Sequence, residues 1–256
     1  MVNLVTVCGH NTTMLRHMLN HYRDFVDEIF IIVYLSSDKD RVLSEVKQIS
    51  LDLNIDIHKQ TIEEPFNWER VTELYNETKL LKPDDWWIVS DDDEFHIYPK
   101  PISELIGECE EKGYKFITGA FLDRIGENGK FPTITDDSDI WKEFPLVGSF
   151  RQTISNACPN KTVVMKGDIQ ITNGQHYAMI DGQDTYGDRW NHPLRYPIDK
   201  CFTYHEEYKK MFDYIVDNNF KIDIMNKEFM VTKSGKEYFD YPYWDLIKKR
   251  SLEYRV

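Results

Sequence analysis

Apolar residues along the first 120 positions of the chain form two different patterns, short continuous runs and a helical spacing. Short apolar runs rich in β-branched and aromatic residues predict β-strands at 4–8, 29–35, 55–57, 86–90 and 115–121. Between these runs apolar residues recur at helical spacing, which predicts helices that begin after Thr12 or Thr13 and cover about 42–53, 67–80 and 102–113. Strands that alternate with helices predict an α/β fold with a mainly parallel, Rossmann-type sheet flanked by helices.

The first of these helices illustrates the pattern. Thr12 or Thr13 is its expected cap. The residues expected to share its buried face are Met14, Leu15, Met18, Leu19 and Tyr22.

The periodicity fades between about residues 125 and 160, where glycine and proline interrupt the chain. This region predicts loops and short antiparallel strands that form a wall of the substrate site. A strand is expected again at 161–165, and helices are expected at 206–218 and 243–254. We therefore expect one domain in three parts, 1–122, 123–200 and a helical extension at 201–256.

The strand predicted at 86–90 ends in a cluster of acidic residues, Asp91-Asp92-Asp93-Glu94. Adjacent carboxylates repel one another unless a cation neutralises them, and oxygen ligands suit Mg²⁺ or Mn²⁺, which also bind phosphate oxygens. A solvated acidic loop is the alternative interpretation. The position favours a binding site, because open α/β sheets bind ligands beyond the carboxyl ends of their strands.

Composition excludes several classes of function. The net charge of −13 argues against non-specific binding to nucleic acid or to anionic membranes. The four cysteines lie far apart without a Cys-x-x-Cys pair, so neither a zinc ribbon nor a disulfide scaffold is indicated. The N-terminus lacks the features of a signal peptide, and no stretch approaches the ~18 apolar residues of a membrane span. We expect a cytoplasmic protein.

Several motifs together resemble one enzyme family. A strand that ends in Asp-x-Asp-Glu-Phe after a β-α-β-α-β-α unit resembles the family 2-like glycosyltransferases of GT-A fold. The segment Asp123–Gly129 is similar to an Asp-Arg-x-x-x-x-Gly segment of these enzymes, and Lys161 with Gly174-Gln175-His176 resembles their closing Lys-strand and Gly-x-His pair. The likeness covers about residues 1–180. The chain departs from the commonest opening by carrying His10-Asn11 where such enzymes often have Asn-Glu.

The resemblance implies a GT-A-like fold and a metal-dependent glycosyltransferase that moves a sugar from a nucleotide-diphosphate sugar to a saccharide acceptor, and we expect a UDP-sugar as the donor. Residues 1–122 would form the nucleotide-sugar-binding half, and 123–200 the acceptor-side and metal-closing half. The residues expected around the donor are His10, Asn11, Asp38, Arg70, Asp91 and Asp92. Those expected at Mn²⁺ or Mg²⁺ are Asp93, Asp91 and His176.

The chemistry of glycosyl transfer supports these roles. The leaving diphosphate develops negative charge, which a divalent metal stabilises. Asp93 is the best direct ligand, Asp91 could act through water or hold the donor, and His176 would favour Mn²⁺. An inverting enzyme also needs a general base, for which Asp123 is the first candidate because it is expected just past a strand.

Each role has a structural alternative. Asp92 could only solvate its loop, Arg70 could form an exposed salt bridge on a helix, His176 could be a surface histidine, and Asp123 could pair with Arg124. Two other functions also stay open. A nucleotidyl- or phosphotransferase is disfavoured by the absence of a Gly-x-x-x-x-Gly-Lys-Ser/Thr loop. A non-catalytic carbohydrate-binding protein would use the many aromatic residues as stacking surfaces.

Overall fold

The structure is a computed structural model of the 256-residue chain. It describes residues 1–37, 41–98, 100–126, 133–148, 158, 160–185, 195–201, 220–225 and 228–233. The chain divides into two units, which we describe separately. The first unit comprises Met1–Asp92, Tyr98–Gly119 and Asn160–Arg195, and the second comprises Asp93–Ile97, Ala120–Pro159 and Tyr196–Val256. The three-part division expected from the sequence stays a prediction.

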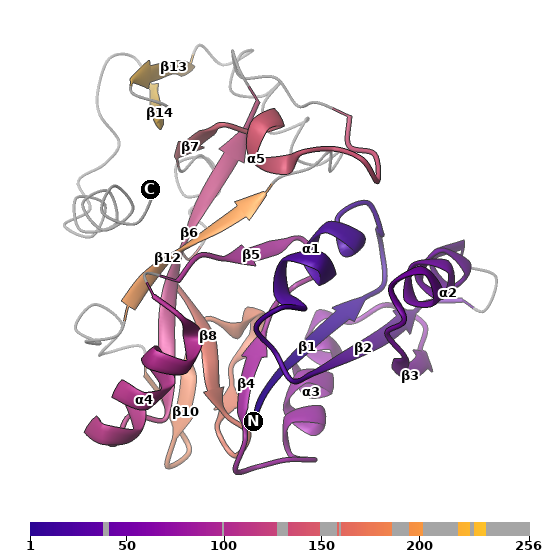
Figure 1. The fold of residues 1–256 in the computed structure, drawn as a ribbon, viewed down its shortest axis with the longest axis vertical. Coiled ribbons are helices and arrows are strands. Elements are labelled where there is room, and N and C mark those ends of the chain that lie inside the picture. Colours follow the sequence, from indigo (N-terminus) through magenta and orange to yellow (C-terminus); the bar gives the residue numbers. More distant parts are fainter. Residues whose placement is uncertain are drawn as a thin grey trace. The chain divides into compact units, whose positions relative to one another are not determined.

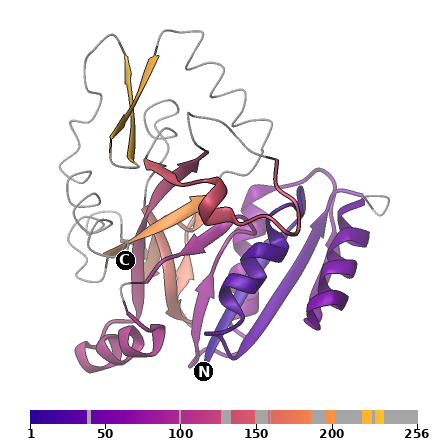
Figure 2. The same cartoon turned by 45° about the horizontal axis from the view of Figure 1, so that its top comes forward.

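The first unit contains a sheet in the order β8-β4-β1-β2-β3 (Figure 1). Its large elements are β1 (Val2–Cys8), α1 (Leu15–Tyr22), β2 (Glu28–Leu35), α2 (Arg41–Leu53), β3 (Ile57–Ile62), α3 (Trp68–Lys79), β4 (Trp86–Val89), α4 (Ile102–Lys112) and β8 (Asn160–Lys166). Strand β1 pairs in parallel with β2 and with β4, and β2 pairs in parallel with β3, whereas β8 runs antiparallel to β4. Figures 1 and 2 show β1 and β2 side by side. The predicted α/β class with a mainly parallel sheet is confirmed.

A smaller antiparallel sheet completes the first unit. It contains β9 (Gln170–Ile171), β10 (Ala178–Ile180) and β11 (Gln183–Asp184), and a short 3₁₀ turn, η2 (Asn173–Gln175), precedes β10.

The second unit contains short strands and one short helix. Its elements are β5 (Glu94–His96), α5 (Ile140–Glu143), β7 (Leu146–Gly148), β12 (Arg195–Cys201), β13 (Phe220–Met225) and β14 (Glu228–Lys233). Strand β6 (Phe116–Ile125) begins in the first unit and ends in the second, where β7 pairs with it antiparallel. Of these, β7 is a short strand within the range of about 125–160 where short antiparallel strands are expected. Strands β13 and β14 lie in the extension at 201–256, where the sequence predicts helices and no strand. The helices predicted at 206–218 and 243–254 lie outside the described residues.

Helices cover both faces of the first unit's sheet. On one face, Leu74 and Tyr75 of α3 join a buried cluster with Val7 of β1 and Val89 of β4. Ser90 points to the opposite face, because neighbouring residues of an extended chain alternate, and its hydroxyl lies 3.2 Å from the Tyr22 hydroxyl of α1. The five residues expected on one face of that helix, of which Met14 precedes it and the other four belong to it, are all buried.

The predicted cap of α1 is wrong. The helix begins at Leu15 with Met14 at the N-cap position and without a side-chain cap. The Thr12 hydroxyl instead donates a hydrogen bond to Glu45 of α2 at 2.5 Å. A tertiary contact has therefore replaced the local cap.

The third strand begins later than predicted, at Ile57 instead of residue 55. Asn54 has a φ of 54°, and the Ile55 amide donates to the Ser50 carbonyl at 2.9 Å, so residues 54–56 form the turn that closes α2. Strand β3 lies at the edge of the sheet, and its side chains alternate between half-buried and exposed. An edge strand tolerates polar residues such as Lys59, which hides it from a search for apolar runs.

No helix among the described residues has the length and hydrophobicity that crossing a membrane requires.

Candidate functional site

The carboxyl ends of β1 and β4 lie next to each other at the C-terminal end of the first unit's sheet, which is called the C-terminal edge below. Val5 of β1 pairs with Val89 of β4 in parallel register, and the Ser90 amide donates to the Val5 carbonyl at 3.2 Å. His10 and Asp91, which follow these strands, therefore lie at the C-terminal edge. This is the edge at which open α/β sheets bind ligands.

Asp91 is held by side chains from three other elements. Its Oδ2 lies 2.9 Å from the Lys161 Nζ of β8, and the Lys161 side chain is only 4% exposed. Its Oδ1 accepts hydrogen bonds from Gln175 Nε2 at 2.6 Å and from the Tyr75 hydroxyl of α3 at 3.1 Å. Both carboxylate oxygens are thus engaged, and the charge of Asp91 is balanced by a buried ammonium.

The ring of His176 is oriented by the backbone of β8. Its Nδ1 lies 2.8 Å from the backbone carbonyl oxygen of Asn160, and the side-chain Nδ2 of Asn160 donates a hydrogen bond to the backbone carbonyl of His176. Because a carbonyl oxygen only accepts, Nδ1 carries the proton and the lone pair of the neutral ring is on Nε2. Metal-binding histidines commonly have this arrangement, in which the second ring nitrogen donates to a backbone carbonyl.

Aromatic rings gather beside His10 at the C-terminal edge. The His10 ring lies 4.1 Å from Phe66 and 5.5 Å from Trp68 between centroids, and the Trp68 side chain is 69% exposed. Phe66 also stacks on Tyr34 of β2, with 4.6 Å between the ring centroids, and this contact holds the Phe66 ring in place. The backbone at position 9 passes so close to Tyr34 that only a glycine fits there, since a Cβ would lie 2.2 Å from the Tyr34 carbonyl oxygen.

The start of α3 fixes where Trp68 stands. Asn67 is the N-cap, and its side chain accepts a hydrogen bond from the Glu69 amide at 2.9 Å. The Asn67 amide in turn donates to the Tyr34 hydroxyl at 2.9 Å. The cap and the tyrosine together hold the first turn of α3 against β2.

Arg70 of α3 forms ion pairs with three carboxylates, those of Glu73 and Glu77 on the same helix and that of Glu63 just after β3. Its guanidinium lies 3.1 Å from Glu63, 2.9 Å from Glu73 and 2.6 Å from Glu77. The hydrogen bonds that Arg70 donates to these carboxylates, above all to Glu77, raise the pKa of Arg70, and the bond from Arg70 lowers the pKa of Glu77. The contacts with Glu73 and Glu77 are helix salt bridges of the kind that the sequence offered as the alternative to diphosphate binding.

The remaining predicted donor residues have different surroundings. Asn11 is half-buried, and its side-chain oxygen accepts a hydrogen bond from the Thr13 amide at 2.8 Å. Asp92 is half-buried at the end of the first unit's opening segment, and Asp93, also half-buried, begins the second unit. Asp38 lies outside the described residues.

The sequence predicts that Asp123 lies just past a strand, but in the structure Asp123 lies within one. Strand β6 extends to Ile125, and Asp123 is paired with Gly148 of β7. The strand continues past the predicted end at residue 121 because β7 provides a hydrogen-bonding partner from a region that shows no strand pattern of its own. The role of Asp123 as a base stays a prediction.

Three residues of the Asp91 site escape assignment from the sequence alone. Lys161 gives the clearest signal, because a lysine inside a buried strand needs a charged partner. Gln175 is the middle residue of the Gly-x-His motif formed with Gly174 and His176, and nothing in the neighbouring sequence indicates that its side chain is buried. Tyr75 follows the helical pattern of a core residue, so its hydroxyl contact with Asp91 has no sequence signal.

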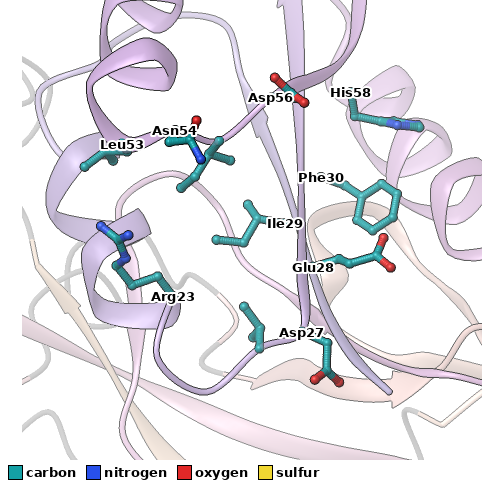
Figure 3. A pocket seen from close by; sticks show the side chains of 11 residues that line it. Arg23, Asp27, Glu28, Ile29, Phe30, Leu53, Asn54, Asp56 and His58 are labelled. Carbon is teal, nitrogen blue, oxygen red and sulfur yellow. The ribbon is translucent and has the colours of Figure 1, made fainter.

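The structure also contains a cavity of about 490 Å³ at the opposite edge of this sheet (Figure 3). Glu28, the first residue of β2, lies on its wall, as does Asp56, whereas the acidic segment follows the last residue of β4. Glu28 is paired with Lys82 at 2.5 Å, and the Asp27 carboxylate accepts from the Val2 amide at 2.7 Å. The cavity is therefore separate from the candidate site.

Within the described residues, no three His, Cys, Asp or Glu side chains converge as a metal site. The metal centre expected from Asp91, Asp93 and His176 stays a prediction.

Comparisons with known proteins give distant structural likenesses. No protein-family model matches the chain, and no curated protein matches it. A structure of S. aureus TarS aligns over 86% of this chain and 40% of that chain, at 14% identity and a TM-score of 0.40. A structure of S. aureus TarS 1-349 in complex with UDP-GlcNAc aligns over 82% of this chain and 61% of that chain, at 12% identity and a TM-score of 0.42.

A 4-diphosphocytidyl-2C-methyl-D-erythritol synthase aligns over 65% of this chain and 75% of that chain, at 14% identity and a TM-score of 0.37. The chain spans less than two thirds of the length of the two TarS chains. Likenesses at this level establish neither a family nor an activity.

Proposed function

We propose that the chain is a metal-dependent glycosyltransferase that moves a sugar from a nucleotide-diphosphate sugar, with a UDP-sugar as the first candidate, to a saccharide acceptor. The observation that carries this proposal is the acidic segment that begins at Asp91, one residue after the buried strand β4, which is parallel to β1. The exposed rings of His10 and Trp68 at the C-terminal edge support it, because a nucleobase can stack on such rings.

The proposed divalent ion has one change from the ligand set expected from the sequence. The ion supplies stabilisation of the charge that develops on the leaving diphosphate. Asp93 and the Nε2 of His176 would hold it, and a nitrogen ligand favours Mn²⁺ over Mg²⁺. We assign the direct contacts to Asp93 and His176 and not to Asp91, because Lys161, Gln175 and Tyr75 already bond to the two oxygens of Asp91.

The other residues act on the donor and the acceptor. We assign His10, Asn11, Asp38 and Asp92 to the donor side. The sequence predicts the same role for Arg70 and Asp91, which are engaged in the ion pairs described above. Asp123 would accept the proton of the attacking hydroxyl if the transfer inverts the anomeric configuration.

The test is nucleotide binding with and without Mn²⁺. We expect one nucleoside diphosphate among UDP, GDP and CDP to raise the melting temperature only when Mn²⁺ is present. Asp93→Asn should abolish this Mn²⁺-dependent shift and leave the fold intact. Asp84→Asn is the matched control, because it makes the same change of charge at an exposed residue just before β4.

Three results would contradict the proposal. A folded Asp93→Asn protein with wild-type nucleotide affinity would remove the metal assignment. Stabilisation by free sugar without a nucleotide would indicate a carbohydrate-binding protein. Release of pyrophosphate from a nucleoside triphosphate and a sugar phosphate would indicate a nucleotidyltransferase.

A further inference from the structure

The turn that carries His176 has an unusual backbone. Gly174 has a φ of 68°, and Gln175, which has a side chain, has a φ of 60°. The turn is closed by the Gln175 amide, which donates to the Thr172 carbonyl at 2.8 Å, and by the Thr172 amide, which donates to the Tyr177 carbonyl at 2.9 Å. A left-handed conformation costs free energy for any residue other than glycine and persists only where other contacts hold it.

The side chain of Gln175 provides such a contact. It is only 2% exposed, and its Nε2 donates to Asp91 Oδ1 at 2.6 Å. Because a carboxylate only accepts hydrogen bonds, the amide nitrogen must face Asp91, and Oε1 is then left without a partner among the described residues. An unpaired buried oxygen is a second cost at the same residue, so the charge-assisted bond to Asp91 is the contact that offsets both.

Asp91 is a fixed point to which the turn can be attached. Lys161 holds Oδ2 from β8, and Tyr75 holds Oδ1 from α3. Tyr75 also lies at hydrogen-bond distance from the backbone of β1, with its hydroxyl 3.3 Å from the Val7 amide. Through Gln175, the turn is therefore linked to the ends of three sheet strands.

The residue that follows Gln175 is His176, whose Nδ1 must carry a proton to reach the Asn160 carbonyl. A free imidazole in water has no partner that selects this tautomer. The selection requires the turn to hold the ring at β8, and the turn is held by Gln175 at Asp91.

We propose that Gln175 is a positioning residue, which attaches the strained turn to Asp91 so that His176 presents an unprotonated Nε2 to a divalent cation. In this role Asp91 is the anchor of the turn and not a metal ligand. The cation is part of the proposed function, whereas the positioning of the ring does not depend on it.

The test compares the tautomer of His176 in metal-free protein. Long-range ¹⁵N–¹H spectra of the imidazole rings, recorded at alkaline pH, report which ring nitrogen is protonated. The His176 signals are assigned among the eight histidines by their loss in His176→Ala. We expect the wild-type ring to be protonated at Nδ1, and the ring in Gln175→Leu to be protonated mainly at Nε2.

A second variant and a control separate positioning from folding. Gln175→Asn keeps an amide and tolerates the left-handed backbone but is too short to reach Asp91, so it should behave like Gln175→Leu even if that variant folds poorly. Asn173→Ala changes an exposed residue of the same turn and should leave the tautomer unchanged. The Mn²⁺ dissociation constant, measured from free Mn²⁺ by electron paramagnetic resonance, should rise about 10–100-fold in both Gln175 variants.

Gln175 variants that keep the Nδ1–H tautomer and the wild-type Mn²⁺ affinity would overturn the positioning role. Wild-type protein that binds no Mn²⁺ would overturn the proposed function and the cation's part in this proposal, while the tautomer comparison would still decide the role of Gln175.

Discussion

Lys79, the last residue of α3, gives the sharpest prediction about stability. Its side chain is 0% exposed, and its Nζ donates to the Ile169 carbonyl and lies 3.3 Å from the Met165 sulfur. Burial lowers the pKa of Lys79 from 10.5 to about 7, although nearby Asp168 opposes the change. We predict that Lys79→Met stabilises the protein at pH 6, because it removes a buried charge and keeps a side chain of similar length.

The magnitude follows from the two pKa values. A difference between 10.5 and about 7 corresponds to about 5 kcal/mol of cost for the charged lysine below pH 7. The methionine leaves the Ile169 carbonyl without its donor, which costs about 1–3 kcal/mol. The variant should therefore be more stable than the wild type by about 2–4 kcal/mol at pH 6.

The pH dependence provides a second measurement. The folded pKa of Lys79 is the lower one, so between pH 7 and 10.5 the unfolded chain binds a proton that the folded chain does not, and stability rises with pH. From pH 6 to pH 9 the wild type should gain about 3 kcal/mol that Lys79→Met lacks.

Urea unfolding followed by tryptophan fluorescence at both pH values measures these differences. Lys82→Met serves as the control, because Lys82 lies just after α3 in an ion pair with Glu28 at the surface. Its effect should stay within about 1 kcal/mol at either pH. A Lys79→Met protein that is less stable than the wild type at pH 6, or that shares its pH dependence, would refute the reasoning.

Two further predictions concern the acceptor and the shape of the site. Asp123→Asn should bind nucleotide and Mn²⁺ normally in calorimetry yet lose ~10²–10⁴-fold of sugar transfer, and an equal loss of donor affinity would instead make Asp123 structural. Gly9→Ala should lower the free energy of unfolding by about 1–3 kcal/mol, because the new methyl group meets the Tyr34 carbonyl at 2.2 Å. Gly107→Ala in α4 meets nothing within 4 Å and should raise that free energy by about 0.5–1 kcal/mol, so equal effects at both glycines would contradict the packing argument.

The sequence predicts the first unit well because local and tertiary preferences agree there. The run at 29–35 is almost wholly apolar and becomes β2, buried over its last six residues. Helix α3 ends at Lys79, close to the predicted stop before Pro83. The failures occur where tertiary contacts decide. The edge strand β3 needs no apolar run, and β6 is lengthened by β7, whose three residues carry no pattern of their own.

The candidate site shows a similar division. Asp91 and His176 are noticeable in the sequence because strand ends and glycine turns mark them. The pairing of Asp91 with Lys161 and Tyr75 is not visible in the sequence, because these residues lie 70 and 16 residues from Asp91 along the chain. Which side chain meets a carboxylate over such separations depends on the packing of strands and helices. A motif thus indicates where a site is, whereas the role of each carboxylate within it depends on its neighbours.

The ion pair at Asp91 also bears on how ligands would bind. Since Lys161 already balances Asp91, that carboxylate adds little net negative charge to attract a cation, and the proposed ligand Asp93 must rely on other negative charge nearby. A nucleoside diphosphate brings such charge. The chain itself carries a net charge of −13, however, and therefore repels a nucleotide that arrives without a metal ion. If the proposed function is right, each ligand should bind better in the presence of the other, and by linkage the two enhancements must be equal. A site built in this way would take up the metal and the nucleotide together.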